Sequence, residues 1–82
     1  MKLEIISPDK LVFQGEVKSV NLPGSAGRFT VLPRHTALIS SLKAGEIIYQ
    51  QEEGTVSIKI DGGFAEVKND VISVCVENVI AD

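Results

Sequence analysis

Alternation of apolar and polar residues is the clearest signal in this chain. Residues 56–60 alternate strictly, with Val56, Ile58 and Ile60 on one face and polar residues on the other, which is typical of a strand with one buried face. Asp61-Gly62-Gly63 then ends the strand in a turn. Segments of similar length predict further strands at Leu3–Ile6, Lys10–Phe13, Glu16–Leu22, Ile47–Tyr49, Phe64–Lys68 and Val71–Glu77.

Turn signals separate these segments about every 8–12 residues, the spacing of an all-β sandwich or barrel. Glu52-Glu53-Gly54 predicts one hairpin, and Asn69-Asp70 predicts a second with a two-residue turn. The composition agrees: nine isoleucines, ten valines and three threonines make the 82-residue chain rich in β-branched side chains, which favour strands.

The segment from Arg34 to Ala44 does not fit this pattern. It contains neither glycine nor proline, and Leu38, Ile39 and Leu42 stand at helical spacing. The pattern alone therefore leaves a single short helix open at this point.

Length and charge limit the classes of function. A chain of 82 residues makes one domain with a small core, so that a partner surface is expected to complete it. The net charge of −3 leaves no basic surplus for nucleic acid. A single cysteine, Cys75, cannot form an internal disulfide and fits a reducing compartment. With no membrane-length apolar run and no signal peptide pattern, we expect a soluble intracellular domain.

Residues that could carry chemistry are few. His35 is the only histidine and has no neighbouring carboxylate, and Cys75 lies within an expected strand without a flanking base, so that a buried and inert thiol is expected there. Gly24–Gly27 lacks the Gly-Lys-Ser/Thr that would make a phosphate loop, and a loop connecting strands explains it better. The adjacent acids at Glu52–Glu53 suit an exposed hairpin tip. We therefore expect neither an enzyme nor a metal or cofactor site.

Several fragments, read in order, resemble one family, the epsilon subunit of F-type ATP synthases. Pro23–Ile39 is similar to its G-x-x-G…(I/V)-L-P-x-H-x-x-(L/I) segment, Leu42–Gly45 to its L-x-x-G and Asp61–Val67 to its G-G-F-x-E-V. The opening stretches Leu3–Asp9 and Phe13–Val17 are similar to its I-V-S-P…F-x-G-x-V start. Each fragment alone is weak, but together they span nearly all of the chain.

The resemblance implies a fold. It predicts a single flattened β-sandwich of two sheets over residues 1–82, of the type found at the N-terminus of the epsilon subunit, with the family's C-terminal two-helix domain absent. The inhibition of ATP hydrolysis and the ATP binding associated with that helical domain are then expected to be absent too. It also favours loop and strand, not helix, between residues 34 and 44.

The resemblance implies a function as well: a non-catalytic subunit of the rotating central stalk, peripheral on the cytoplasmic face of the energy-transducing inner membrane. Its implied partners are the gamma subunit and the membrane c-ring, with no small-molecule substrate, nucleic acid or direct insertion into the membrane. Ser7 and His35 are implied to face gamma. The loop implied to face the c-ring consists of Gly24, Ser25, Ala26, Gly27, Arg28 and Phe29.

The sequence departs from the family pattern at three places. Arg28 stands where an acidic residue is common, and a cation there is expected to reverse the sign of one contact with the c-ring. Thr30 replaces a frequent glycine, and Thr36-Ala37 replaces a frequent Ala-Pro. Two other functions remain open: a free-standing β-sandwich adaptor for an unrelated protein, and an enzyme that uses His35 or Cys75.

Overall fold

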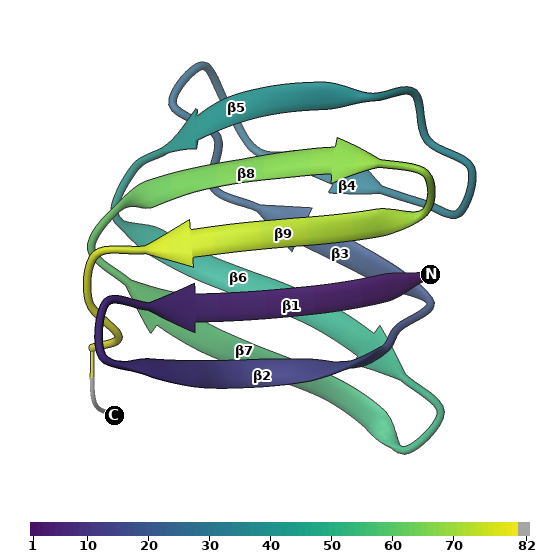
Figure 1. The fold of residues 1–82 in the computed structure, drawn as a ribbon, viewed down its shortest axis with the longest axis horizontal. Helices are drawn as coiled ribbons and strands as arrows, with labels where there is room; N and C mark the ends of the chain where they lie inside the picture. The colour runs from purple at the N-terminus through teal and green to yellow at the C-terminus, as the bar shows by residue number, and fades with distance from the viewer. Residues whose placement is uncertain (81–82) are drawn as a thin grey trace.

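The protein is a sandwich of two β-sheets in the computed structural model, which describes residues 1–80 (Figure 1). The five-stranded sheet has the order β2-β1-β9-β8-β5, and the four-stranded sheet has the order β4-β3-β6-β7. No helix occurs in the described residues. The strands are β1 (Lys2–Ser7), β2 (Lys10–Glu16), β3 (Ser19–Leu22), β4 (Phe29–Val31), β5 (Leu38–Leu42), β6 (Gly45–Gln51), β7 (Gly54–Ile60), β8 (Gly63–Lys68) and β9 (Val71–Val76).

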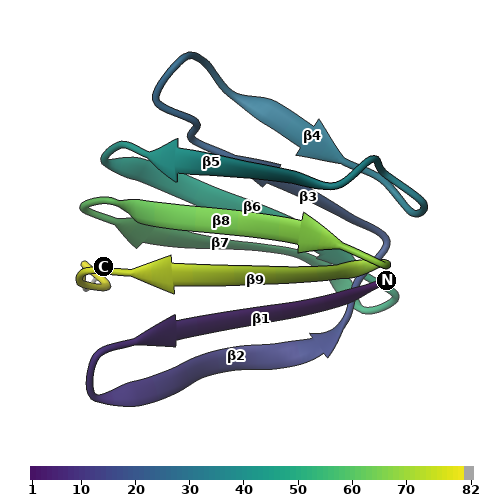
Figure 2. The same cartoon turned by 45° about the horizontal axis from the view of Figure 1, so that its top comes forward.

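The sandwich is flattened, with extents of 29 × 29 × 21 Å. The strands of the four-stranded sheet cross behind the five-stranded sheet at an angle, and Figure 2 shows the two layers from a second direction. This confirms the two-sheet all-β fold expected from the sequence. Between the sheets lies the core, made of Leu3, Ile5, Val17, Val20, Leu22, Val31, Leu42, Ile47, Tyr49, Ile60, Ala65, Val67, Ile72, Val74 and Val76.

Both expected hairpins form. Lys68 pairs with Val71 across the turn, and Asn69 and Asp70 adopt φ values of 53° and 61°, which a tight two-residue β-hairpin requires. Gln51 pairs with Gly54 at the tip of the β6–β7 hairpin. Asparagine and aspartate tolerate positive φ better than most residues, so the local sequence selects the first of these turns.

The short helix left open between residues 34 and 44 is wrong. Leu38–Leu42 is strand β5, paired antiparallel with β8. Leu38 and Leu42 face the core side, whereas Ile39 is 74% exposed on the outer face. The period of two is hidden in the sequence because a serine, Ser40, takes the inward position opposite Ala65 and an isoleucine takes an outward one.

The single strand expected at Glu16–Leu22 is also wrong, because the chain changes sheets there. Glu16 ends β2 in one sheet and Ser19 begins β3 in the other. Val17 donates its N–H to the carbonyl of Met1 at 2.9 Å, and Lys18 donates to the carbonyl of Gln50 at 2.7 Å. These two consecutive hydrogen bonds therefore point to different sheets, and the strand cannot continue through them.

Gly63 begins β8, just after the chain has passed from β7 in one sheet to β8 in the other. Its φ is 150°, and a Cβ at this position would lie 2.1 Å from the carbonyl oxygen of Cys75. Only glycine meets both demands. The turn expected at residues 61–63 is thus confirmed, and its last glycine also allows β8 to pack closely on β9.

Candidate functional site

A row of apolar side chains crosses the outer face of the five-stranded sheet. Strand register places Leu11 opposite Ile6, Ile6 opposite Cys75, and Cys75 opposite Phe64. We call these four residues the apolar row. Leu11 is 52% exposed, Ile6 38% and Phe64 53%. Large contiguous apolar patches on the surface of a protein mark sites of interaction with other molecules.

The neighbouring positions on the same face are mostly polar. Glu4 lies opposite Gln14 on one side and Ser73 on the other, and the Gln14 amide donates to the Glu4 carboxylate at 3.3 Å. On β8, Glu66 lies opposite Ser73 on one side and opposite Ile39 of β5 on the other. Acidic groups therefore border the apolar row along the strands.

Cys75 differs from the expected buried thiol. The inward residues of β9 are Ile72, Val74 and Val76, so Cys75 points outward and is half-buried between Ile6 and Phe64. Alternation along β9 decides this orientation, because its three fully apolar inward positions set the register of the strand.

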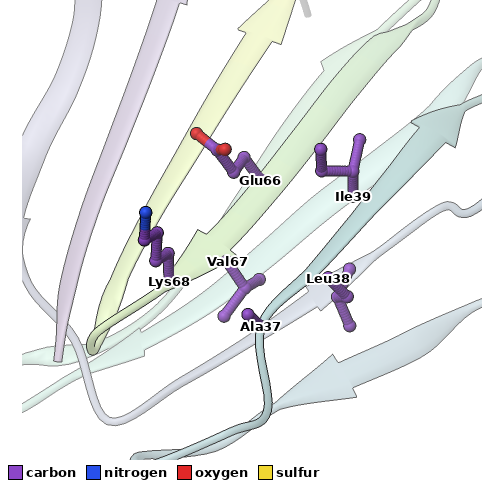
Figure 3. A pocket seen from close by; sticks show the side chains of 6 residues that line it. All are labelled: Ala37, Leu38, Ile39, Glu66, Val67 and Lys68. Atoms are coloured by element: carbon purple, nitrogen blue, oxygen red, sulfur yellow. The ribbon is translucent and has the colours of Figure 1, made fainter.

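An open hollow of about 360 Å³ lies beside this face at the β5–β8 pair (Figure 3). Aliphatic groups form most of its wall, with one carboxylate and one ammonium from β8, and the lining residues are Ala37, Leu38, Ile39, Glu66, Val67 and Lys68. Polar groups do not converge in it, as they do in a pocket for a small ligand. The hollow suits aliphatic contact with another protein.

The outer face of the four-stranded sheet is mostly polar, with Ile48 as an apolar member between Asn21 and Ser57, and its polar side chains are hydrogen-bonded to one another. The Asn21 amide donates to Thr30 Oγ1 at 2.9 Å between β3 and β4, and Ser57 Oγ donates to the Glu46 carboxylate at 2.7 Å between β7 and β6. The two outer faces of the sandwich thus differ in chemistry: one carries the apolar row, and the other carries hydrogen-bonded polar side chains.

The loop between β3 and β4, residues Gly24–Phe29, is closely fitted to the sandwich. Ser25 donates its N–H to the carbonyl of Ser41 at 3.0 Å, and the two serine hydroxyls are 2.8 Å apart. Gly27 donates to the carbonyl of Gly24 at 3.0 Å. The expectation of a loop connecting strands is confirmed, and the hydrogen bonds give the loop a defined shape.

Close packing explains the glycines around this loop. A Cβ at Gly24 would lie 2.6 Å from the carbonyl oxygen of Gly27 and 2.8 Å from the Phe29 ring. A Cβ at Gly45 would lie 2.9 Å from Pro23 Cβ. Gly27 has open space around it but adopts a φ of 135°, which favours glycine.

The Arg28 side chain lies along the four-stranded sheet and does not extend from the loop. Its Nε donates to Asn21 Oδ1 at 2.6 Å, and its Nη2 donates to the carbonyl of Glu46 at 2.5 Å. The cation that the sequence placed at a contact with the c-ring is thus hydrogen-bonded within the chain itself.

The two residues implied to face gamma are far apart: Ser7 ends β1, and His35 lies in the loop between β4 and β5. Figure 1 shows the end of β1 and the β4–β5 loop at opposite ends of the sandwich. Ser7 ends β1, where its hydroxyl donates to Asp9 Oδ1 at 2.9 Å. His35 is half-buried in the β4–β5 loop, with Nδ1 2.7 Å from the carbonyl oxygen of Thr36. A surface that includes both must run the length of the five-stranded sheet.

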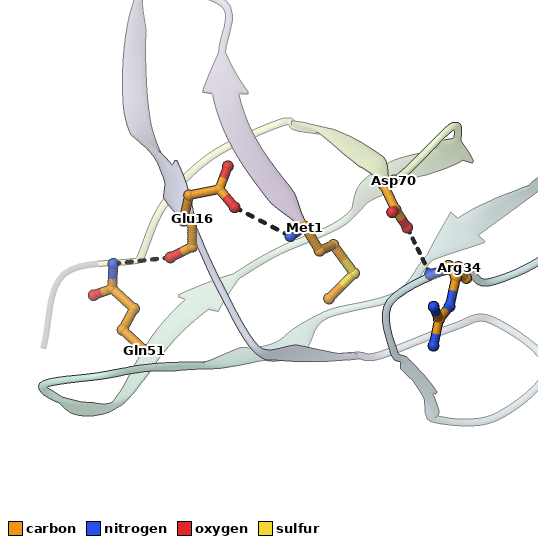
Figure 4. Close-up of polar contacts among 5 residues, drawn as sticks. All are labelled: Met1, Glu16, Arg34, Gln51 and Asp70. Carbon is orange, nitrogen blue, oxygen red and sulfur yellow. Dashed lines mark hydrogen bonds and ion pairs between the residues drawn. The ribbon is translucent and has the colours of Figure 1, made fainter.

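The end of the sandwich near His35 is fastened by polar contacts that sequence reasoning missed (Figure 4). Asp70 Oδ1 accepts a hydrogen bond from the Arg34 backbone N–H. The N-terminal ammonium of Met1 forms an ion pair with Glu16 at 3.1 Å, and the Gln51 amide donates to the Glu16 carbonyl at 3.4 Å. The sequence marked Asp70 only as a turn residue and gave no role to Asn21 or to the Glu46 carbonyl, because their hydrogen-bond partners are brought near by the fold and not by a local motif.

The structure does not bring together His35 and Cys75, the two residues considered for catalysis. His35 lies near the β8–β9 hairpin, and Cys75 lies five residues further along β9, or roughly 16 Å at the rise of a strand. Within the same residues, no three His, Cys, Asp or Glu side chains gather where they could hold a metal ion. Nor does any helix there have the length and apolarity needed to cross a membrane.

Fold and surface together define a two-sheet β-sandwich module with an apolar row on one outer face. Comparison with known proteins identifies the family: residues 1–82 match the β-sandwich domain of the ATP synthase delta/epsilon chain, and the chain belongs to this family. It is 39% identical over 82 residues to an ATP synthase epsilon chain of Sulfurovum sp., covering 99% of this chain and 64% of that one. It is 46% identical over 81 residues to an ATP synthase epsilon chain of Campylobacter jejuni, covering 98% and 63%.

Solved structures show the same fold at low sequence identity. A chain of the Euglena gracilis mitochondrial ATP synthase, in a structure of OSCP, F1 and c-ring, matches with a TM-score of 0.88 at 23% identity, over 95% of this chain and 51% of that one. A chain of the Tetrahymena thermophila mitochondrial ATP synthase central stalk and c-ring matches with a TM-score of 0.82 at 10% identity, over 96% and 64%. The chain thus spans less than two thirds of the length of each of these relatives.

Proposed function

We propose that the protein is a non-catalytic rotor subunit of the F1 sector of an F-type ATP synthase. It links the gamma subunit to the membrane c-ring and so couples ion translocation to ATP synthesis. The family and the epsilon-chain relatives support this role, as do matched chains in structures that include the c-ring. Its location would be peripheral, on the cytoplasmic face of the energy-transducing membrane.

We place the gamma-binding surface at the apolar row. Phe64 and Leu11 are each about half exposed in the described structure of residues 1–80, so burying the remaining half of each favours association by roughly 0.8–1.5 kcal/mol. Ser7 directly follows Ile6 of the row, so a partner seated on the row would reach Ser7 at its margin. A partner that runs along the strands would reach His35 at the other end.

The loop Gly24–Phe29 is proposed to face the c-ring. The loop adjoins the apolar row. The carbonyl of Ser41 accepts a hydrogen bond from the backbone N–H of Ser25, and Ser41 lies opposite Phe64 in strand register. A single rigid body then presents both surfaces. Transmission of torque needs such stiffness, which close packing between two sheets supplies.

Calorimetric titration of the chain into the gamma subunit of the same organism tests this function. We expect one-to-one binding with a negative heat-capacity change, because apolar surface is buried. Phe64→Ser should weaken binding at least about tenfold, since one aromatic anchor can contribute roughly 2 kcal/mol or more.

Val56→Ser is the matched control, because Val56 is 37% exposed on β7, away from the apolar row. It should bind gamma as the unchanged chain does. A folded chain with no affinity for gamma would contradict the rotor function and favour the alternative, an adaptor for an unrelated protein. An equal loss of affinity for gamma in Phe64→Ser and Val56→Ser would contradict the assignment of the apolar row as the gamma-binding surface.

A further inference from the structure

The guanidinium of Arg28 joins two strands of the four-stranded sheet to the β3–β4 loop. Nε donates to the side chain of Asn21 on β3 at 2.6 Å, and Nη2 donates to the backbone carbonyl of Glu46 on β6 at 2.5 Å. Two donors on one planar group, aimed at two fixed acceptors, use the fork geometry that lysine lacks.

Both acceptors of Arg28 are themselves held in place. The amide nitrogen of Asn21 donates to Thr30 Oγ1 at 2.9 Å, which fixes the orientation in which its oxygen faces Arg28. The Glu46 carbonyl belongs to β6, whose neighbours are β3 and β7. The Glu46 carboxylate is engaged elsewhere, by Ser57 Oγ at 2.7 Å. The charge of Arg28 is thus met by dipoles of the sheet at well-defined positions.

The tip of the loop, Ser25, Ala26 and Gly27, is exposed and carries no charge. Its backbone is held by the hydrogen bonds from Ser25 to Ser41 and from Gly27 to Gly24. Arg28 follows directly and anchors the end of the loop where it enters β4. The part of the loop that can meet another molecule is therefore small, uncharged and preorganised.

We propose that Arg28 is a positioning residue. It holds the Gly24–Phe29 loop against the four-stranded sheet, so that the loop contacts the c-ring through the shape and backbone groups of Ser25–Gly27 and not through a charge. This inference rests on the proposed function for its partner. It replaces the sequence-based expectation that the Arg28 cation itself contacts the c-ring. Asn21 then supports the loop indirectly, as the hydrogen-bond acceptor that holds Arg28.

The variant Arg28→Lys separates the charge of the side chain from its hydrogen-bonding geometry. The lysine keeps the positive charge but loses the two-pronged hydrogen bonding, whereas Arg28→Gln loses the charge as well. Asn21→Ala removes an acceptor of Arg28 from outside the loop and leaves the charge of the chain unchanged. Lys43→Gln is the matched control, because it removes a neighbouring exposed cation without touching Arg28.

Hydrogen exchange of the isolated chain tests the anchoring without any partner. Exchange at the Ser25 and Gly27 amides should accelerate about tenfold in Arg28→Lys, Arg28→Gln and Asn21→Ala, because a hydrogen bond from a charged group contributes more than a neutral one. It should stay unchanged in Lys43→Gln. Core amides such as those of Leu3 and Ile72 report whether each variant is still folded. Unchanged exchange at Ser25 and Gly27 in folded Arg28→Gln would overturn the proposal.

Binding of the chain–gamma complex to detergent-solubilised c-ring, measured from low to high salt, tests the contact. We expect Arg28→Lys and Asn21→Ala to weaken binding by similar factors, with the salt dependence of the unchanged chain retained. If Arg28→Lys binds normally while Arg28→Gln binds weakly with an altered salt dependence, the cation is a direct contact and the proposal fails. If the unchanged complex does not bind the c-ring, the proposed function fails at this loop, and hydrogen exchange alone decides the anchoring.

Discussion

Asp70 Oδ1 accepts a hydrogen bond at 2.5 Å from the backbone N–H of Arg34, which lies 36 residues earlier in the chain (Figure 4). The backbone carbonyl of Asp70 accepts a second hydrogen bond, from the N–H of Lys2 at 2.9 Å. One residue thus joins the β8–β9 hairpin, the start of β1 and the loop that carries His35. This explains how a loop without regular structure holds His35 in place.

Replacing Asp70 by glycine should destabilise the protein, although it improves the local turn. A glycine directly after Asn69 would suit the two-residue hairpin better than the aspartate does, because both turn residues have positive φ. Asn69→Gly relieves the same kind of strain and keeps the carboxylate, so it is the matched control. We expect Asp70→Gly to be less stable than Asn69→Gly by about 1.5–3 kcal/mol, the contribution of a hydrogen bond to a charged group. Equal midpoints in urea unfolding would show that the Arg34 contact contributes nothing.

Gly63→Ala should be among the most damaging single substitutions. The added Cβ would meet the Cys75 carbonyl at 2.1 Å and would also force alanine into a φ of 150°. Gly54→Ala shares the positive φ, at 141°, but has open space around it. Strain of this kind costs about 1–3 kcal/mol, so Gly54→Ala should lose that amount and Gly63→Ala clearly more. Thermal unfolding of the two variants, compared with each other, measures the steric part; similar losses would refute it.

Two isoleucines of the same sheet should respond very differently to truncation. Ile5 is completely buried between the sheets, and Ile39 is 74% exposed on the outer face. Ile5→Ala should lower the free energy of unfolding by about 2–5 kcal/mol. Ile39→Ala should change it by less than about 0.5 kcal/mol. Denaturant titration checks both, and a large loss in Ile39→Ala would mean that β5 is oriented with its other face inward.

Tyr49 should make the protein sensitive to strongly alkaline pH. Burial raises the pKa of the Tyr49 phenol above its ordinary value of 10.0, because the charged phenolate is poorly solvated beside the Phe13 ring, 4.4 Å away between centroids. Below pH 10 the phenol is neutral in both the folded and unfolded states and costs nothing. Above it, the unfolded chain releases the proton first, so stability falls as pH rises.

Tyr49→Phe should therefore lose less stability than the unchanged chain between pH 9 and pH 11. Urea unfolding at a series of pH values measures the difference in stability between the two chains. All other ionisable groups are the same in both, so their contribution cancels in the comparison. Parallel stability curves for the two chains would exclude Tyr49 as the source.

Local signals predicted much of this fold. The Asn69-Asp70 turn and the Glu52–Gly54 hairpin could be predicted from the sequence because each depends on adjacent residues. The strand at residues 56–60 was readable too, but alternation could not show that burial increases along it from Val56, which is exposed, to Ile60, which is fully buried. Val56 lies towards the tip of the β6–β7 hairpin, whereas Ile60, at the other end of β7, forms an isolated β-bridge with Val79.

Contacts between distant residues were not predictable. The switch of sheets at Val17 and Lys18 depends on carbonyls of Met1 and Gln50. The apolar row depends on the register of four strands, and all of its members, including Cys75, look like core residues in the sequence. The loop Gly24–Phe29 was located from resemblance, but the direction of the Arg28 side chain follows from Asn21 and Glu46, which only the fold brings near.

The parallel pairing of β1 with β9 has a consequence for synthesis of the chain. β1 (Lys2–Ser7) and β9 (Val71–Val76) are neighbours inside the five-stranded sheet, and of the nine strands described β1 is synthesised first and β9 last. Until β9 emerges, β1 can pair with β2 alone, and its other edge stays open to strands of neighbouring chains. Completion of the five-stranded sheet must therefore wait until β9 has been translated, and a pause in translation between β2 and β9 would prolong the period in which nascent chains can aggregate.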